Sequence, residues 1–185
     1  MKIAISGSIG SGKTTVCEYL KEKGYDVFDC DEVNRNLLEE GNEGWIRVCE
    51  AFPECVEEGK LDKKKLSSLI FSDEENRKKL EGIMHPLILK KLMEREDDPL
   101  FAEVPLLFEV GWDQYFDSTL LVVTDLDLLI ERMKERGYTK EETLSRLSQQ
   151  MDVTEKIKRA DKIIYNNGSL DDLCAATQQW LNEIL

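Results

Sequence analysis

Gly7-Ser8-Ile9-Gly10-Ser11-Gly12-Lys13-Thr14 is the stretch that decides the fold of this chain. Residues 2–6, just before it, are dense in apolar side chains and predict a buried strand. Just after it, Val16, Tyr19 and Leu20 fall on one stripe of a predicted helix. The glycines therefore lie at a turn from a strand to a helix, which is the context that the pattern G-x-x-x-x-G-K-[ST] requires.

A loop of this kind binds phosphate because its glycines let the backbone turn tightly around an anion. Several backbone N–H groups then converge on the phosphate oxygens, and the helix N-terminus adds its partial positive charge. In this pattern Lys13 reaches the β- and γ-phosphates, and the Thr14 hydroxyl holds Mg²⁺. The stretch predicts that the chain binds a nucleoside triphosphate.

Composition limits the partners of such a protein. The chain has 185 residues, the usual length of one domain, and its formal net charge of −13 disfavours nucleic acids and anionic membranes. The 5 cysteines are scattered and form no C-x-x-C pair, so neither a disulfide framework nor a zinc site is expected. No apolar run reaches the length of a membrane span, and the chain begins with a strand rather than a signal. We expect a cytoplasmic protein that acts on small molecules, with no nucleic acid, no membrane and no obligate protein partner.

Further strands are predicted at residues 25–29, 100–104, 119–124 and 161–165, with helices between them. This alternation predicts a three-layer α/β fold with a parallel sheet of five strands and right-handed crossovers. We expect a single domain over residues 1–185. It would carry a helical excursion at about 32–99 and a helical lid at about 128–152.

No strand is expected within the excursion, where apolar residues recur at helical spacing. Its last helix is predicted to open with a capping box at Ser72-Asp73-Glu74-Glu75. This helix carries the only histidine, His85, followed by Pro86, which should kink or break it. A lone histidine beside a kink is more often structural than catalytic.

Acidic residues at strand ends are candidates for metal binding or proton transfer. Asp29 and Asp31 lie at the C-terminal end of the second strand, where either one faces the phosphates or both only cap the next helix; spacing favours neither alternative. Glu103, Glu109 and Asp125 compete for the same roles.

Arg132, Arg136 and Arg146 stand out in so acidic a chain. They form ordinary helical ion pairs, such as Arg132 with Glu135 and Arg146 with Glu142, or they belong to a lid that supplies positive charge to a transferred phosphoryl group. The sequence has no N-K-x-D motif for reading guanine, and its acidity disfavours a nucleic-acid ATPase. A small-molecule kinase combines a phosphate loop, a carboxylate base, an acceptor site and an arginine-bearing lid.

The motifs then resemble one family, the dephospho-coenzyme A kinases, almost from end to end. The glycine-rich loop is similar from Gly7 to Thr15, and the D-x-D-x-x-x-R element is matched by Asp29-Cys30-Asp31 and Arg35. The later elements stand as Leu61-Asp62-Lys63, Leu80 to Pro86, Pro105 to Glu109, Arg132 with Arg136, Arg146 to Gln150, and Ala160-Asp161 through Asn166. Each string is weak alone, but their order over one short chain is specific.

The resemblance implies a P-loop nucleoside triphosphate hydrolase fold and ATP-dependent phosphorylation of the ribose 3′-hydroxyl of dephospho-CoA. It implies that Asp31 is the general base and that Lys13 stabilises the transferring phosphoryl group. Arg35 and His85 are implied to bind the acceptor with Asp31, and Thr14 to bind Mg²⁺. The implied ATP-binding residues are Gly7, Gly10, Ser11, Gly12, Lys13, Thr14, Thr15, Arg136, Arg146 and Asn166.

Two positions depart from the family pattern. Glu103 stands where the family usually has Asp, and Leu129 stands where it often has Gln. A phosphate loop is also compatible with two other functions: a nucleoside or nucleoside-monophosphate kinase, and a non-catalytic ATP-sensing module. The presence of Asp31 argues against a sensor, which needs no base beside the γ-phosphate.

Overall fold

The computed structural model describes residues 1–185. The chain forms two compact units. The first contains Met1–Asp29 and Asp97–Leu185, and the second contains Cys30–Glu96.

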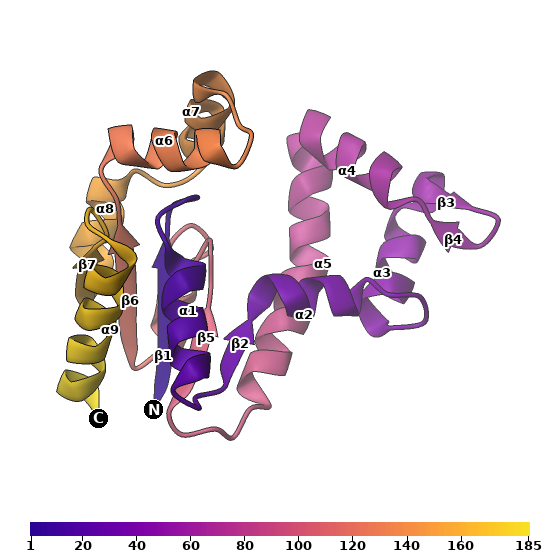
Figure 1. The fold of residues 1–185 in the computed structure, drawn as a ribbon. Coiled ribbons are helices and arrows are strands. Elements are labelled where there is room, and N and C mark those ends of the chain that lie inside the picture. Colours follow the sequence, from indigo (N-terminus) through magenta and orange to yellow (C-terminus); the bar gives the residue numbers. More distant parts are fainter. The chain divides into compact units, whose positions relative to one another are not determined.

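The first unit is built on a parallel sheet of five strands (Figure 1). The strands lie in the order β2-β5-β1-β6-β7, so β1 is central. Their bounds are β1 Lys2–Gly7, β2 Val27–Asp29, β5 Leu100–Glu103, β6 Ser118–Val123 and β7 Lys162–Tyr165. All five predicted strands are confirmed, with ends shifted by one or two residues.

Two helices cover one face of this sheet. α1 (Lys13–Glu22) packs on β1 and β5, α9 (Leu170–Ile184) packs on β7, and the two helices contact each other (Figure 1). The core between them and the sheet includes Ile3, Ile5, Val16, Leu20, Phe101, Val122, Leu173 and Trp180. The connection from β6 to β7 contains α8 (Val153–Arg159), which contacts β6. The predicted three-layer α/β fold is confirmed.

Between β6 and α8 the chain forms α6 (Leu126–Glu135) and α7 (Lys140–Ser148). Thr139 and Glu142 make a reciprocal capping box at the start of α7, and Ser169 and Asp172 make another at the start of α9. Each box satisfies two N–H groups that a helix N-terminus otherwise leaves unpaired. The loop after β5 includes a short 3₁₀ turn, η2 (Trp112–Tyr115).

The second unit consists of α2 (Cys30–Leu37), α3 (Glu43–Ala51), α4 (Lys63–Ser72) and α5 (Glu74–Met93), with a 3₁₀ turn, η1 (Pro53–Cys55). Its buried side chains include Val48, Phe52, Leu66, Leu87 and Leu92. The expectation of no strand here was wrong, because β3 (Val56–Glu57) and β4 (Lys60–Leu61) pair as a small antiparallel hairpin. Glu58 and Gly59, the turn between them, both have positive φ, of 51° and 77°. Gly59 was a signal for the turn in the sequence. Strands of two residues, however, are too short to show the alternation of apolar and polar residues that predicts a strand.

Pro86 does not break α5, contrary to one of the two outcomes expected for it. The helix is continuous from Glu74 to Met93. A proline ring clashes with the carbonyl of the fourth residue before it, here Gly82. Gly82 is exposed and a side chain there would meet nothing, so the turn has room to adjust and water can solvate its carbonyl.

The predicted capping box of α5 was wrong by one residue. Asp73 is the N-cap, and its carboxylate accepts hydrogen bonds from the N–H groups of Glu75 and Asn76. Ser72 ends α4 instead, where its hydroxyl donates to the carbonyls of Ser68 and Leu69. A carboxylate at the N-cap also interacts favourably with the helix dipole.

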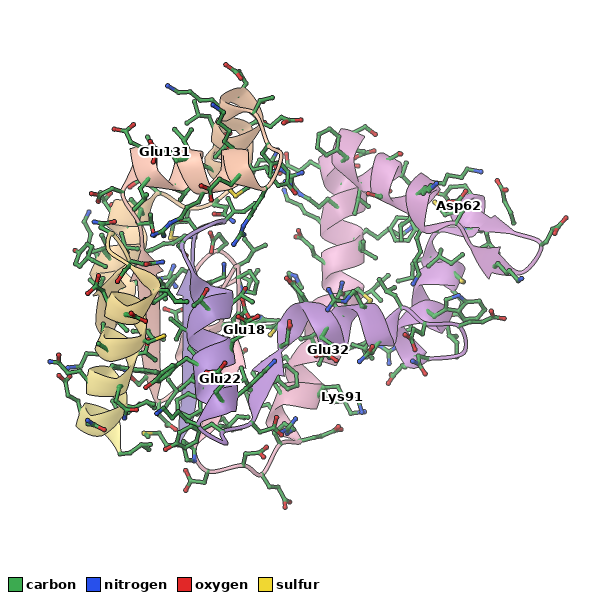
Figure 2. All side chains as sticks on the ribbon, in the orientation of Figure 1. Glu18, Glu22, Glu32, Asp62, Lys91 and Glu131 are labelled. Atoms are coloured by element: carbon green, nitrogen blue, oxygen red, sulfur yellow. The ribbon has the colours of Figure 1, made fainter.

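Charged side chains cover the helices on their solvent sides. The labelled Glu18 and Glu22 on α1 and Glu131 on α6 are exposed and point away from the sheet (Figure 2). None of the helices is long and apolar enough to cross a bilayer.

Candidate active site

The phosphate loop joins the end of β1 to the start of α1, as predicted. Gly12 has a φ of 103°, and a Cβ atom there would lie 2.3 Å from Asn166 Nδ2. A Cβ at Gly7 would lie 2.5 Å from the carbonyl oxygen of Val122. The loop is therefore packed so closely against neighbouring strands that these two positions have no room for a side chain.

The loop contains a donor suited to an anion. α1 begins after Gly12, which has no side chain to cap the helix. The Ser11 hydroxyl is buried and has no hydrogen-bond partner. Because a buried donor without a partner is costly, this arrangement suits an anion that would accept from it. The Lys13 ammonium also lies at the loop, where it donates to the Ser8 carbonyl at 3.4 Å.

Asn166 fixes the loop from the end of β7. Its Nδ2 donates to the Ser11 carbonyl at 2.8 Å, and the Thr124 hydroxyl donates to the same carbonyl at 3.0 Å. Asn166 is 6% exposed. The Arg132 guanidinium reaches Thr124 Oγ1 at 3.3 Å and Asn166 Oδ1 at 3.5 Å. Three segments that are distant in sequence thus meet at one loop carbonyl.

A pocket of about 240 Å³ opens beside this junction. It is lined by Gly10, Gly12, Thr15, Arg132, Arg136, Asn166, Gly168, Leu170 and Leu173. The structure therefore brings predicted residues Arg136 and Asn166 together with the loop. Arg132, Gly168 and the two leucines were missing from the predicted ATP-binding residues; for Arg132 the R-x-x-x-R motif was a usable signal.

Arg146 does not line this pocket. Its guanidinium carbon lies 4.8 Å from the centroid of the Tyr138 ring, as a cation–π contact. The suggested ion pairs with Glu135 and Glu142 are absent, since Arg132 contacts Thr124 and Asn166, and Glu142 accepts the N–H of Thr139. Arg132 and Arg146 are therefore held by contacts other than ordinary surface ion pairs.

Glu103, at the end of β5, contacts the loop. Because Glu103 pairs in register with Ile5 of β1, it lies next to the strand that leads into the loop. The Thr14 hydroxyl donates to Glu103 Oε1 at 3.0 Å. The Cys17 thiol lies beside the same carboxylate; burial raises the pKa of Cys17, and the charge of Glu103 and a hydrogen bond to it add to this shift. Hydroxyl and carboxylate oxygens are ligands that Mg²⁺ prefers, so this pair fits a magnesium ion.

The other two competing acids have different surroundings. Glu109 Oε1 lies 2.7 Å from the Lys156 ammonium and accepts the N–H of Met151 at 3.0 Å. Asp125 is exposed and precedes α6 without capping it through its side chain. Its backbone N–H donates to Asn167 Oδ1 at 2.9 Å. Only Glu103 of the three therefore contacts the phosphate loop through its side chain.

Leu129, one of the two departures from the family pattern, packs beneath the loop. It is 3% exposed, and its Cγ would lie 3.6 Å from a Cβ atom at Gly10. Met133, one turn further along α6, would lie 3.0 Å from the same atom. The apolar residue at 129 thus extends the contact between α6 and the phosphate loop.

The predicted acceptor residues lie in the second unit. Asp31 and Arg35 are exposed on α2, one helical turn apart, and therefore share a face of that helix. His85 is partly buried on α5, and burial lowers its pKa while the charge of Glu81 opposes this shift. This unit also contains a pocket of about 390 Å³ lined by Val33, Asn36, Leu37, Asn42, Glu43 and Lys91.

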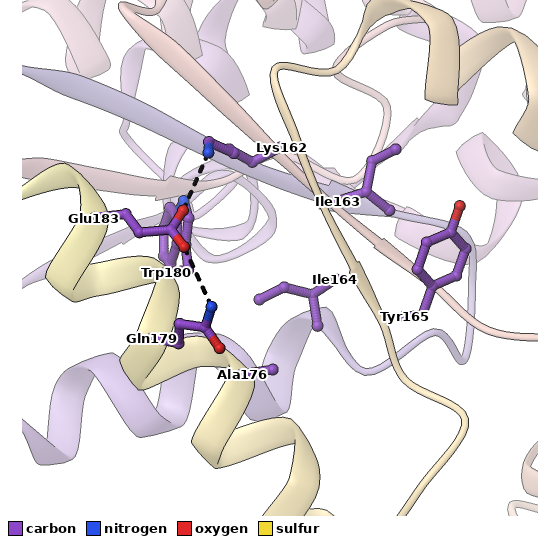
Figure 3. Close-up of a pocket in the computed structure, with 8 residues that line it drawn as sticks. All are labelled: Lys162, Ile163, Ile164, Tyr165, Ala176, Gln179, Trp180 and Glu183. Carbon is purple, nitrogen blue, oxygen red and sulfur yellow. Dashed lines mark hydrogen bonds and ion pairs between the residues drawn. The ribbon is translucent and has the colours of Figure 1, made fainter.

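A further pocket of about 210 Å³ lies between β7 and α9 (Figure 3). Lys162 and Glu183 form an ion pair at its rim with an N–O distance of 3.1 Å, and Trp180 lies beside them. None of the predicted site residues lines this pocket. The pocket at the phosphate loop is therefore the candidate nucleotide site of the first unit.

The parallel sheet, the phosphate loop with its Thr14–Glu103 pair, and the arginine-bearing helices define the class of P-loop kinases. Residues 1–172 match the family model for dephospho-CoA kinase. The chain belongs to the dephospho-CoA kinase family.

Individual relatives agree with this membership. The curated dephospho-CoA kinase of Thermus thermophilus is 43% identical over 187 residues, covering 98% of this chain and 91% of that protein. The crystal structure of TT1252 from Thermus thermophilus matches with a TM-score of 0.87 at 40% identity, covering 100% of this chain and 98% of that one. Dephospho-CoA kinase from Campylobacter jejuni matches with a TM-score of 0.73 at 28% identity, over 100% and 98% of the two chains. Both the predicted family and the predicted fold are confirmed.

Proposed function

We propose that this protein transfers the γ-phosphoryl group of ATP to the ribose 3′-hydroxyl of dephospho-CoA, which gives coenzyme A and ADP. The observation that carries the proposal is the family match over residues 1–172, which includes both the phosphate loop and the whole second unit. This reaction is the last step of coenzyme A synthesis.

The phosphate loop supplies the donor site. The N-terminus of α1, the Ser11 hydroxyl and Lys13 would bind the triphosphate. The adenine would occupy the pocket that Leu170, Leu173 and Asn166 line, with Arg136 at the phosphates. Arg146 would join them only after the lid, residues 128–152, has closed.

Thr14 and Glu103 would hold Mg²⁺. When bound, the ion would neutralise charge on the β- and γ-phosphates and orient them. Glu103 is one methylene longer than the aspartate usual in the family, and here it reaches the Thr14 hydroxyl directly.

Asp31 is the proposed general base. β1 and β2 belong to one parallel sheet, so the phosphate loop after β1 and the segment after Asp29 leave the same edge of that sheet. Asp31 would accept the proton of the 3′-hydroxyl as its oxygen attacks the γ-phosphorus, and ADP would leave as the P–O bond to the β-phosphate breaks. Arg35 and His85 would bind the acceptor within the excursion of residues 32–99. We further propose that residues 1–185 act as one kinase domain in the cytoplasm.

An acceptor panel tests the function. Purified protein with Mg²⁺ and ATP is given dephospho-CoA, AMP, CMP or a free nucleoside, and ADP release is measured. We expect rapid release with dephospho-CoA and slow release with the others. Equal or faster turnover with AMP or CMP would identify a nucleoside-monophosphate kinase, and no turnover with any acceptor would favour an ATP sensor.

A further inference from the structure

Glu109 holds the segment that follows the helices of the proposed lid. Its Oε1 accepts a hydrogen bond from the N–H of Met151 at 3.0 Å and lies 2.7 Å from the ammonium of Lys156. The side chain of Lys156 is 0% exposed and that of Glu109 is 17% exposed. The two groups form an ion pair, but their geometry is not that of a hydrogen bond. The other carboxylate oxygen, Glu109 Oε2, has no hydrogen-bond partner. Separating a buried lysine from its carboxylate is costly, so the pair fixes α8 to the loop after β5.

A second contact fixes the same helix to the same loop. Arg159, three residues after Lys156 on α8, donates to the carbonyl of Phe108 at 2.9 Å. It also forms an ion pair with Asp113 at 2.6 Å. Adjacent loop residues, Phe108 and Glu109, thus bind one face of α8 and leave it little freedom to move.

The neighbouring residue, Gln150, connects this anchor to the phosphate loop. Its Oε1 accepts a hydrogen bond from the N–H of Ile9 at 3.3 Å. Thr124 lies just before α6, at the other end of the segment that contains α6 and α7. Its hydroxyl donates to the carbonyl of Ser11 at 3.0 Å. The two residues that flank the segment 125–149 are therefore both hydrogen-bonded to the phosphate loop.

We propose that Glu109 is a positioning residue for ATP binding. It fixes Met151, just after the lid helices, and so keeps Gln150 hydrogen-bonded to the phosphate loop and directs the lid helices over a bound triphosphate. Lys156 is the counter-charge of the partly buried Glu109 carboxylate, and the oxygen that accepts from Met151 N–H is the tether. Glu109 touches no substrate and acts through Met151 and Gln150. The inference rests on the proposed function, because it takes the segment 128–152 as the lid for ATP.

Two double variants separate the hydrogen bond between Glu109 and Met151 from the charges of the Glu109–Lys156 ion pair. Glu109→Gln with Lys156→Met removes both charges but keeps an oxygen that can accept from Met151 N–H. Glu109→Ala with Lys156→Met removes the charges and the acceptor together. The matched control is Glu155→Gln with Lys158→Met, which removes an exposed ion pair on the same helix.

ATP binding is measured by calorimetry, and protection of the lid by ATP is measured by limited trypsin digestion. We expect the Gln/Met variant and the control to bind ATP within about threefold of the wild type, and the Ala/Met variant about tenfold more weakly, with its protection lost. The KM for ATP should rise in the Ala/Met variant while that for dephospho-CoA stays unchanged.

Equal ATP binding and protection in both double variants, with only the thermal stability lowered, would show that Glu109 is merely structural. An equal rise in both KM values would also overturn the proposal. The binding readout needs no acceptor, so failure to phosphorylate dephospho-CoA would refute the proposed function without affecting this test.

Discussion

Asn166 and Ser11 are 155 positions apart in sequence, and the side chain of Asn166 donates a hydrogen bond to the Ser11 carbonyl at 2.8 Å. This bond joins the end of β7 to the phosphate loop that follows β1. Because the Asn166 side chain is buried, water cannot readily replace the Ser11 carbonyl as its partner, and breaking this hydrogen bond costs free energy. The residue that the resemblance implies to bind ATP therefore also holds the loop.

Asn166→Ala should weaken ATP binding by about tenfold to a hundredfold. The change leaves a buried carbonyl with one donor fewer, which costs about 1–3 kcal/mol and loosens the loop. Calorimetry with ATP measures the effect. The control is Asn182→Ala, on the exposed side of α9. Unchanged ATP affinity in Asn166→Ala would mean that the bond does not stabilise the loop for binding.

Gly12→Ala should abolish measurable ATP binding while the fold persists. A Cβ at Gly12 would lie 2.3 Å from Asn166 Nδ2, whereas a Cβ at Gly24 would meet nothing within 4 Å. Both glycines have positive φ, of 103° and 90°, so both substitutions add backbone strain but only one adds the clash. Gly24→Ala is therefore the matched control. If the two variants bind ATP equally well, the packing of Asn166 on the loop does not matter.

Glu103→Gln should raise the Mg²⁺ concentration needed for half-maximal activity by about tenfold to a hundredfold. The amide cannot supply the negative charge that the proposed ion requires, and altered metal surroundings typically cost that much. Glu103→Asp restores the residue usual in the family and should retain a low Mg²⁺ requirement. A magnesium titration of the rate measures both. Equal titration curves for the wild type and the Gln variant would contradict a metal role.

The sequence predicted the phosphate loop and the strands because their signals are local. Apolar runs mark buried strands, and the glycines with Lys13 and Thr14 stand next to each other. The contact of Glu103 with Thr14 was not predictable in this way, since it depends on β5 lying beside β1 in the sheet order. Spacing along the chain does not contain that order, so Glu103, Glu109 and Asp125 stayed equivalent.

The partners of individual side chains were also not predictable from spacing along the chain. Arg132 was a plausible partner of Glu135 at helical spacing, yet it contacts Thr124 and Asn166 across the structure. A surface ion pair contributes little to stability, so the contacts of Arg132 with the less exposed Thr124 and Asn166 are favoured over a pair with Glu135. Of the two outcomes expected at Pro86, the break does not occur, because exposed Gly82 one turn earlier leaves room for the ring.

Asp31→Asn should lower kcat by about 10²–10⁴-fold with dephospho-CoA, because loss of a general base typically has this effect. ATP binding should be retained, since the asparagine has nearly the same shape and Asp31 is not among the proposed ATP ligands. Single-turnover kinetics and ATP calorimetry measure the two quantities. A near-normal kcat would mean that Asp31 is not the general base and that Glu103 or another acid has this role.

His85 should make stability depend on pH near neutrality. Burial lowers the pKa of His85 in the folded protein, so the unfolded chain binds its proton first as the pH falls. The free energy of unfolding should therefore decrease as the pH falls through the ordinary histidine pKa of about 6.5 to below the lowered one. Urea unfolding at pH 7.5 and 5.5 should show a smaller decrease for His85→Gln than for the wild type. This is the only histidine, so an equal decrease would show that other groups dominate.

Phosphorus NMR of the product formed from dephospho-CoA, ATP and Mg²⁺ tests the central claim most directly. The account predicts one new phosphomonoester on the ribose 3′-oxygen for each ADP released, and none with an acceptor that lacks the 3′-hydroxyl. Phosphate on another hydroxyl, or ADP release without a new phosphomonoester, would contradict it.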